Sequence, residues 1–192
     1  MARNVEFNEE EAIQKAMKVF WEKGYSGASL RDLTDAMKIN SSSLYNTIGD
    51  KHELFVKCIK NYTETRMEEA RKRAASAKSP LTALVNLIND SVTGIINGEN
   101  SCMVIKTTFE VAVADKSVQA ILKADSDFTR GFLRSLITNA REMGELTEGE
   151  DAEMLTDYLL SVFTGWHESY IIHQDPVRIR KMAQYLITQL SR

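Results

Sequence analysis

The chain has few of the residues that make tight turns or covalent cross-links. Its 192 residues include only 2 prolines, 9 glycines and 2 cysteines. An all-β fold needs many tight turns, in which proline and glycine are favoured, so this fold class is excluded. Cys58 and Cys102 are too few for a disulfide framework or a four-cysteine zinc site, and they favour a reducing, cytoplasmic environment.

Long apolar runs are also missing. The longest one, Met103–Ala114, is interrupted by Lys106 and Glu110 and falls short of the roughly 18 residues of a membrane span. The N-terminus leads into acidic residues without an apolar signal segment. With 43% apolar residues, 27% charged residues and a net charge of −3, the composition is that of an ordinary globular protein and not of a membrane protein.

No catalytic or metal-binding motif is complete. His167-Glu168 begins like the zinc motif H-E-x-x-H, but Ile171 stands where the second histidine is required. His173 lies about 240° further round a helix, so it cannot bind the same metal ion. The chain has neither a glycine-rich phosphate loop nor a G-x-S-x-G segment. We therefore expect no catalytic residue, no metal and no cofactor.

Apolar residues recur at helical spacing along almost the whole chain. In the first segment, Ala12, Ala16 and Phe20 share one helix face, and the pattern ends at Gly24. Polar residues that can cap a helix N-terminus precede the later segments. The predicted fold is all-α, with about nine helices near residues 12–24, 30–36, 41–48, 50–78, 80–98, 102–114, 115–143, 150–174 and 176–192, and a loop at Thr147–Gly149.

The helices divide into a small group and a larger one. Three short helices and the start of a fourth lie within the first fifty residues, and longer, more apolar helices begin after residue 78. We expect an N-terminal module over residues 1–50 and a larger module over residues 51–192. The fourth helix would connect the two modules.

Residues 29–46 have the layout of a helix-turn-helix. A short helix is followed by the joint Met37–Ile39 and by a second short helix that begins with Asn40–Ser43. Small polar side chains at such a place allow close approach to base edges and phosphates. Lys51, in the first turn of the next helix, suits a phosphate better than it suits the helix dipole. The alternative is an all-α module in which the serines merely cap a helix.

The same segment resembles the N-terminal signature of the TetR (tetracycline-repressor-like) family of transcription regulators. The match runs without a gap, and it depends on Ala16, Phe20, Gly24-Tyr25, Ser29–Leu33, Ala36–Asn40, Leu44-Tyr45, Gly49–Lys51 and Glu53–Phe55. Three positions depart from the family pattern: Lys38 replaces the turn glycine, Ser42 replaces a common glycine, and Ile48 replaces an aromatic residue. These departures leave the base preference open.

The resemblance implies where the chain contacts DNA. The expected contacts are Ser29, Arg31, Ser41, Ser42, Ser43, Tyr45, Asn46, Thr47 and Lys51. Tyr45 and Lys51 suit phosphates, whereas base edges suit Arg31, Ser41, Ser43 and Asn46. Residues 1–53 carry seven basic and nine acidic residues, a net charge of −2. We therefore expect weak nonspecific affinity and tight binding only as a dimer.

The last two helices carry more apolar surface than one face of a helix pair can bury. Such a pair is typical of a four-helix interface between two subunits. The alternative is that both helices only complete the core of the monomer. The interface residues expected from the pattern are Leu155, Tyr158, Leu159, Val162, Met182, Leu186 and Leu190.

The resemblance also implies a cavity for a small-molecule effector in the larger module. Aromatic and aliphatic residues at helical spacing are candidates for its lining, although such residues more often form simple core. An apolar lining favours a hydrophobic or aromatic effector. The candidate lining residues are Cys102, Phe109, Val113, Phe128, Phe132, Trp166, His167 and Tyr170.

Cys102 has two readings. It opens the sixth predicted helix, and Lys106 lies one turn further along. The segment Cys102–Ile105, with Glu110, resembles a stretch in one branch of the family in which a cysteine senses electrophiles or oxidants. Cys102 is then either the sensor of a thiol-reactive effector or a small buried residue, as we expect Cys58 to be.

These observations predict a ligand-responsive transcriptional regulator in the cytoplasm. It would be a repressor that binds a palindrome-like operator in double-stranded DNA as a homodimer and is released by a small molecule. The alternative is a helical adaptor that binds other proteins and has no specific DNA site. The alternative explains the amphipathic helices but not the pattern from Ser29 to Lys51.

Overall fold

A computed structural model describes residues 8–98, 102–146 and 151–190. Within these ranges the chain is helical and contains no strand, which confirms the all-α prediction. None of the helices described is long and apolar enough to cross a membrane. The elements are α1 (Glu9–Gly27), α2 (Leu30–Met37), α3 (Ser41–Thr47), α4 (Lys51–Ser76), α5 (Pro80–Asn97), α6 (Met103–Thr107), the π-helical segment η1 (Thr108–Ala112), α7 (Lys116–Glu142), α8 (Ala152–His173) and α9 (Pro176–Leu190).

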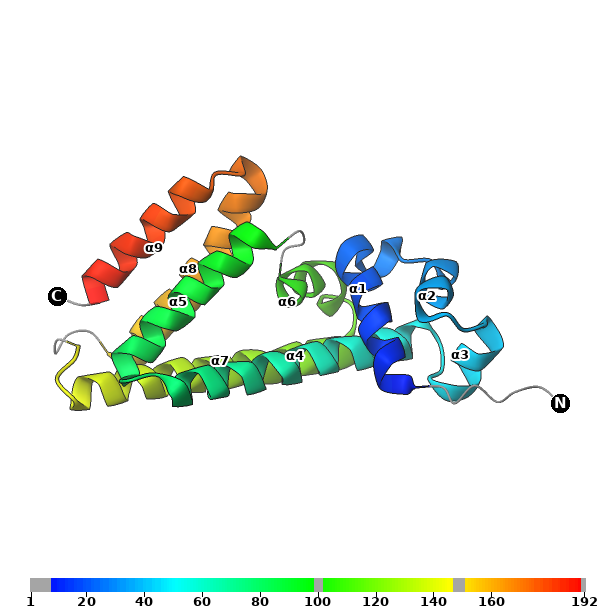
Figure 1. The fold of residues 1–192 in the computed structure, drawn as a ribbon, viewed down its shortest axis with the longest axis horizontal. Coiled ribbons are helices and arrows are strands. Elements are labelled where there is room, and N and C mark those ends of the chain that lie inside the picture. Colours follow the sequence, from blue (N-terminus) through cyan, green and yellow to red (C-terminus); the bar gives the residue numbers. More distant parts are fainter. Residues whose placement is uncertain (1–7, 99–101, 147–150, 191–192) are drawn as a thin grey trace.

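The helices form two groups along the long axis of the molecule (Figure 1). Helices α1, α2 and α3 lie together at one end, and α5, α8 and α9 lie at the other. The long helices α4 and α7 pack against each other and extend between the two ends, while α6 lies beside α1. This arrangement places α6 and η1 between the helix-turn-helix and the rest of the protein.

Helix starts follow the capping residues of the sequence. The Ser29 hydroxyl accepts the N–H of Asp32, and the Asp32 carboxylate accepts the N–H of Ser29, which makes a capping box. Asp50 and Glu53 make a second capping box at the start of α4. Asn40 caps α3 through the N–H of Ser43. These local bonds fix the residues at which α2, α3 and α4 begin, and thus help to orient the side chains that are predicted to contact DNA.

Two apolar clusters hold the structure together. The first joins α1–α4 to α6, η1 and the beginning of α7, with Phe20 and Phe55 meeting edge to face at 4.9 Å between ring centres. The second joins α5, α7, α8 and α9 around residues such as Leu84, Ile137 and Leu159, all fully buried. The first cluster continues past residue 50 into later helices. The proposed boundary at residue 50 stays a prediction.

Two helices differ from the pattern expected from the sequence. The first helix continues to Gly27, although Gly24, with φ +76°, breaks its regular geometry at the expected place. The expected helix 102–114 is divided into α6 and the π-helical η1. Its buried residues Met103, Thr107 and Val111 recur every four positions, a spacing that does not distinguish an α turn from a wider π turn. The predicted loop Thr147–Gly149 lies outside the described residues.

Candidate functional site

The joint between α2 and α3 contains an unusual backbone conformation. Lys38 has φ +59° and ψ +40°, the left-handed region in which glycine is favoured. Its N–H donates to the Asp35 carbonyl, and the N–H of Ile39 donates to the Thr34 carbonyl. The lysine side chain is exposed at this joint. Lys38 therefore adopts the backbone conformation of the turn glycine that it replaces, at a conformational cost of about 1 kcal/mol. It also adds a positive charge next to α3.

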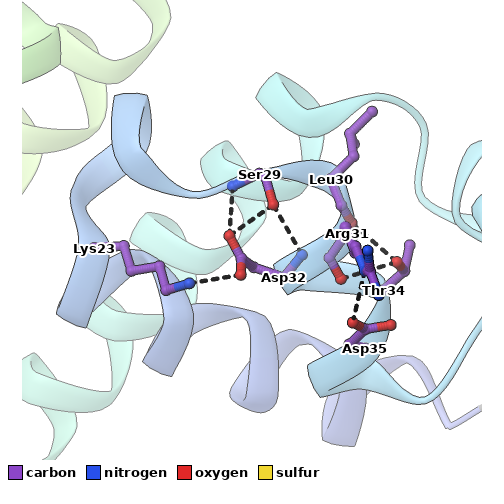
Figure 2. Close-up of polar contacts among 7 residues, drawn as sticks. All are labelled: Lys23, Ser29, Leu30, Arg31, Asp32, Thr34 and Asp35. Carbon is purple, nitrogen blue, oxygen red and sulfur yellow. Dashed lines mark hydrogen bonds and ion pairs between the residues drawn. The ribbon is translucent and has the colours of Figure 1, made fainter.

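Ser29 is held by contacts within its own chain (Figure 2). Its hydroxyl donates to Asp32 Oδ2 at 2.6 Å, and Lys23 Nζ donates to Asp32 Oδ1 at 2.5 Å. The bonds from Lys23 and then those from Ser29 hold the pKa of the Asp32 carboxyl well below its usual range. Ser29 thus positions the start of α2, and its hydroxyl is already engaged in the helix cap.

Arg31 is a highly exposed residue of α2. It is 91% exposed, and its Nε lies 3.6 Å from Asp35 Oδ2, one turn along α2 (Figure 2). Thr34 anchors the same helix by donating to the carbonyls of Leu30 and Arg31. A loose surface pair of this kind contributes little to stability. The guanidinium is therefore available to another acceptor.

Helix α3 presents a polar face to solvent while Leu44 anchors it in the core. Tyr45 is 51% exposed. Ser43 is half-buried because it packs at the capped first turn. The structure brings the remaining predicted residues of α3 together on the exposed side, namely Ser41, Ser42, Tyr45, Asn46 and Thr47.

Lys51 lies over an aromatic ring that the sequence analysis did not connect with it. Its Nζ is 4.7 Å from the centre of the Tyr25 ring, and the side chain is half-buried. Burial, followed by the charges of Asp50 and Asp115, raises the pKa of the Tyr25 hydroxyl. The aromatic face holds the ammonium group at the N-terminus of α4. Tyr25 is thus a positioning residue for Lys51.

Long-range polar contacts join α1 and the start of α4 to α6, η1 and the N-cap of α7. The Glu110 carboxylate accepts the N–H groups of Tyr25 and Ser26 at 3.0 and 2.8 Å. Lys106 Nζ donates to the Trp21 carbonyl at 2.7 Å, and His52 bonds to Asp115. These partners lie between 63 and 85 residues apart in sequence. No local sequence pattern could have revealed them.

A cavity of about 530 Å³ lies among α4, α5, α7 and α8, with Trp21 of α1 at its edge. Four of the predicted residues line it: Cys102, Phe128, Phe132 and His167. The phenyl rings of Phe128 and Phe132 are stacked, with their centres 5.7 Å apart. Residues that the sequence analysis missed also line it, among them Tyr62, Arg66, Leu87, Ser91, Thr129 and Phe163. Its size and its largely apolar wall suit a small organic molecule.

One wall of this cavity is polar. Arg66 donates to both carboxylate oxygens of Asp125 at 2.6 Å and to Thr129 at 3.0 Å. Asp125 is buried, with only 3% of its side chain exposed. Tyr62 Oη lies 3.9 Å from Cys102 Sγ, and burial is the main cause that raises the pKa of the Tyr62 hydroxyl. Cys102 is half-buried at this wall, whereas Cys58 is fully buried.

Comparison with known proteins gives the family. The family model described as bacterial regulatory proteins, tetR family, matches residues 12–58, and the tetracyclin repressor-like C-terminal domain matches residues 78–186. The chain belongs to the TetR family. An uncharacterized HTH-type transcriptional regulator of Bacillus subtilis, YezE, is 30% identical over 161 residues, which cover 80% of each chain. The Escherichia coli HTH-type transcriptional repressor ComR is 24% identical, with 83% of this chain and 77% of ComR covered.

Solved structures of TetR-family proteins share the fold. A cysteine mutant of the TetR family transcriptional regulator CifR, complexed with 26bp double-strand operator DNA, is 26% identical over 97% of this chain and 98% of its own, with a TM-score of 0.82. The reduced form of E. coli NemR has a TM-score of 0.86 over 95% and 96% of the two chains. At 13% identity, NemR shows the fold alone. The protein is thus a DNA-binding transcriptional regulator with the TetR fold.

Four other predicted lining residues are not among those that line this cavity. Phe109 and Val113 are 75% and 82% exposed and line a second pocket, which shares Cys102 and His167 with the first. Trp166 is buried in the second core and borders the groove between α8 and α9. Tyr170 donates to the Ile96 carbonyl at 3.2 Å. Helical periodicity shows which residues form the apolar face of a helix. It does not show whether that face lines a cavity.

The predicted interface residues also divide by exposure. Leu159, Leu186 and Leu190 are buried within the subunit, although Leu186 also lines the groove between α8 and α9. Leu155, Val162 and Met182 are half-buried. Tyr158 is 54% exposed and borders a groove between α8 and α9 together with Val162 and Met182. Other large apolar side chains, outside the predicted interface set, are exposed on the same helices, namely Met154, Ile172 and Tyr185.

The described residues contain no cluster of three or more histidine, cysteine or carboxylate side chains that could hold a metal ion. His167 lies in the cavity wall, and burial lowers its pKa. The matching family model is that of bacterial regulatory proteins.

Proposed function

We propose that this TetR-family protein is a repressor that binds a palindrome-like operator as a homodimer and releases it when a small molecule enters the cavity. One observation carries the proposal. Cys102, which lines the cavity, immediately precedes α6, and contacts from α6 and η1 reach α1, which packs against α2. DNA as the partner also makes the cytoplasm the expected location.

The DNA surface consists of α3 with two cations beside it. Serines 41 and 42 leave room for close approach, Asn46 can pair with a base edge, and Tyr45 offers a hydroxyl. Arg31 flanks α3 from α2, and Lys51 is held over Tyr25 at the N-terminus of α4. CifR, 26% identical, has a structure in complex with operator DNA, which supports DNA as the partner.

The dimer surface is the outer side of α8 and α9. Tyr158 and Tyr185 are 54% and 67% exposed and border one groove. A single α3 of seven residues reads too few base pairs for specificity, so two copies on a palindrome are needed. Burial of these tyrosines against a second copy would supply the contact.

The coupling runs through α6 and η1. Cys102 precedes α6 at the cavity wall, and four residues further Lys106 holds the Trp21 carbonyl. Glu110 then holds the backbone of Tyr25 and Ser26, just before the cap of α2. A molecule that displaces Cys102 would move these contacts and change the position of α2 and α3 relative to DNA.

Gel retardation of the promoter DNA beside the gene tests the proposal. The protein should retard that fragment, Asn46→Ala should change which bases are preferred, and Lys51→Ala should flatten the slope of log affinity against log salt by about one unit per subunit. Asn89→Ala, on the exposed side of α5, is the control for the first variant, and Lys72→Ala, 72% exposed, is the control for the second. Failure to retard any promoter fragment would favour the adaptor alternative.

Sedimentation of Tyr185→Glu tests the dimer. Because Tyr185 is exposed in the subunit, this change should separate the copies and reduce operator affinity without unfolding the subunit. A wild-type monomer at micromolar concentration would contradict the dimer.

A further inference from the structure

The cavity adjoins the second pocket, which has a volume of about 630 Å³ and lies mainly among α6, η1, α7 and α8. Six residues line both spaces, and they come from α4, α5, α7, α8 and the position that precedes α6. We call these residues the junction, and they are Arg66, Ser91, Cys102, Thr129, Phe163 and His167. All six are half-buried, so each keeps part of its surface accessible. The cavity and the second pocket therefore meet at the junction.

The full charges around these two spaces are paired within the chain. Each arginine, lysine, aspartate and glutamate that the described residues contribute to either wall has an oppositely charged neighbour. The pairs are Arg66–Asp125, Arg73–Asp90, Arg73–Glu69 and Lys123–Asp127, with N···O distances between 2.6 and 3.8 Å. A charged ligand would therefore lose its hydration without meeting an unpaired opposite charge on these side chains. The walls thus favour an uncharged ligand.

Two neutral polar groups of the junction have no partner within the described chain. The Ser91 hydroxyl, on α5, and the His167 imidazole, on α8, make neither a hydrogen bond nor an ion pair there. Their polar atoms keep accessible surface, in contrast to Arg66 Nε, which is buried. Burial lowers the pKa of His167, so its ring is neutral near pH 7 and has one donor and one acceptor nitrogen. Both groups can therefore hydrogen-bond to a neutral polar group of a ligand.

The walls on either side of the junction are largely apolar. On the cavity side, the Phe128 and Phe132 rings are stacked with their planes 11° apart. On the other side, Ile105, Leu122 and Leu160 line the second pocket. Apolar surface favours apolar ligand groups, whereas a few polar groups fix the orientation of a ligand. This order of apolar, polar and apolar walls matches a ligand that is apolar at both ends and polar between them.

We propose that the effector is an uncharged molecule with two apolar arms joined by a neutral hydrogen-bonding group, such as an amide or an ester. One arm occupies the cavity, the other occupies the second pocket, and Ser91 and His167 bind the joining group. The proposal rests on the proposed function, because it assigns the chemistry of the effector to that site. A ligand in this position lies beside Cys102, which immediately precedes α6.

Equilibrium dialysis of the wild-type protein without DNA tests the proposal with three probes. The probes are N-benzylbenzamide (two rings joined through an amide), N-methylbenzamide (one ring with the same amide) and 1,3-diphenylpropane (two rings without a polar group). N-Benzylbenzamide should bind at least about tenfold more tightly than N-methylbenzamide, because its second ring is also buried. Equal binding of the two amides would overturn the proposal, and so would no binding of N-benzylbenzamide.

Filling one space at a time tests whether the ligand occupies both. Gly94 lines the cavity but not the second pocket, and a Cβ atom there would meet no other atom within 4 Å. Thr164 is exposed on α8 and lines the second pocket but not the cavity. Gly94→Phe and Thr164→Trp should each weaken the binding of N-benzylbenzamide by about tenfold. N-Methylbenzamide should keep its wild-type affinity in at least one of the two variants, because its single ring needs only one space.

Gly131→Phe is the matched control for the filling variants. Gly131, on α7, also has room for a Cβ atom, but it lines neither the cavity nor the second pocket. The control should bind all three probes as the wild type does. A loss of N-benzylbenzamide affinity in only one of the two filling variants would overturn the occupancy of both spaces.

Ser91→Ala and His167→Leu test the binding of the joining group. Each variant should weaken N-benzylbenzamide by roughly three- to tenfold, because one hydrogen bond is lost, and should not weaken 1,3-diphenylpropane. Ser161→Ala and His173→Leu are the matched controls, since both residues are exposed on α8 and line neither space. Equal losses for the two diphenyl probes, or unchanged binding of N-benzylbenzamide in both variants, would contradict the role of Ser91 and His167.

Operator retardation without any probe tests the proposed function separately. N-Benzylbenzamide should then release the operator from the wild-type protein at concentrations that saturate the site. Probes that bind in the expected order but leave the operator bound would uphold the ligand class and overturn the release step.

Discussion

Two arginine–aspartate pairs, one beside the predicted DNA surface and one at the cavity, differ in their exposure and in the number and length of their contacts. Arg31 and Asp35 are 91% and 72% exposed, with a single contact of 3.6 Å. Arg66 and Asp125 are 39% and 3% exposed, with two bonds of 2.6 Å and a third bond from Arg66 to Thr129. The exposed pair leaves its arginine available to DNA. The buried pair fixes its arginine at the wall of the cavity.

The two cysteines show the same contrast. Cys58 is enclosed in the first core, where its thiol lies 3.6 Å from the Ile13 carbonyl. Cys102 is half-buried at the cavity wall, beside Tyr62. Of the two thiols, only that of Cys102 beside the cavity is therefore accessible to a reagent. The residues predicted to contact DNA are exposed, but none of them carries a thiol.

The largest expected effect is the difference in reactivity between the thiols. Burial raises the pKa of Cys58 to about 12, so almost none of it is thiolate near neutral pH. Cys102 should therefore react with iodoacetamide about 100-fold faster or more, as measured by mass spectrometry of the native protein. In urea both cysteines should react alike, which is the control. Equal, slow labelling of the native protein would contradict the accessible site, and release of operator DNA that persists in Cys102→Ser would contradict a sensor role.

The next effect concerns stability. Asp125→Ala leaves a partly buried guanidinium without its partner, so the free energy of unfolding should fall by about 2–3 kcal/mol, less than for a fully buried pair because Arg66 is 39% exposed. Asp35→Ala should change it by less than about 0.5 kcal/mol. Urea denaturation of both variants measures the difference. Similar losses in the two would mean that burial does not distinguish the pairs.

The third effect is on DNA. Arg31→Ala should weaken operator binding by roughly 10- to 100-fold, while the unfolding free energy stays within about 0.5 kcal/mol of the wild type. Titration of fluorescent operator DNA measures the affinity. If Arg31 reads a base, the loss should disappear on an operator that already lacks the preferred base. An Arg31→Ala protein with full affinity would exclude it from the interface.

The sequence allowed more of the DNA end than of the cavity end to be predicted, for a physical reason. Helix caps such as Ser29 with Asp32, or Asp50 with Glu53, join residues three apart, so the pattern that predicts them is contained in a few letters. The polar wall of the cavity joins Arg66 to Asp125, 59 residues away. Only packing of α4 against α7 brings them together, and neither residue stands out in its own helix.

The apolar positions of each helix were predicted better from the sequence than the neighbour that each apolar side chain faces. Leu159, Leu186 and Leu190 have helical apolar spacing, as the sequence indicated, but they face the core of their own subunit. Phe109 on η1 and Val113 just after it also have apolar character, yet both are exposed. Periodicity gives the apolar face of one helix, whereas the neighbour that covers this face depends on the whole fold. The DNA-contact residues and the dimer surface stay predictions.

The fourth effect links the two ends and depends on pH. Burial alone would raise the pKa of the Glu110 carboxyl, but the hydrogen bonds from the N–H groups of Ser26 and Tyr25 lower it by more. The pKa of Glu110 in the folded protein therefore lies below its pKa in the unfolded chain. The ionised Glu110 carboxylate therefore contributes to the unfolding free energy at pH values above its pKa in the unfolded chain, near 4.3. This contribution is lost as the pH falls through its pKa in the folded protein. Because the site is largely exposed, Glu110→Gln should reduce the unfolding free energy by only about 1 kcal/mol at pH 7, and by less near pH 3, which is below the unfolded pKa.

Denaturation at several pH values measures this difference, and Glu142→Gln, exposed at the end of α7, is the control. A loss that is the same at pH 7 and pH 3 would show that the charge of Glu110 does not stabilise the contact with α1. Because the contact positions α2, operator affinity at pH 7 should fall in the same variant by a few-fold.

The smallest effect is expected from removing the partner of Arg31. Asp35→Asn removes a carboxylate that competes with DNA phosphates and bases for the guanidinium, and it removes a negative charge that repels the duplex. An exposed pair contributes only a few tenths of a kcal/mol, so operator affinity should rise by about twofold at low salt. Screening should abolish the gain at high salt, while the unfolding free energy stays unchanged. Weaker binding of Asp35→Asn at low salt would show that Asp35 orients Arg31 for DNA instead of competing for it.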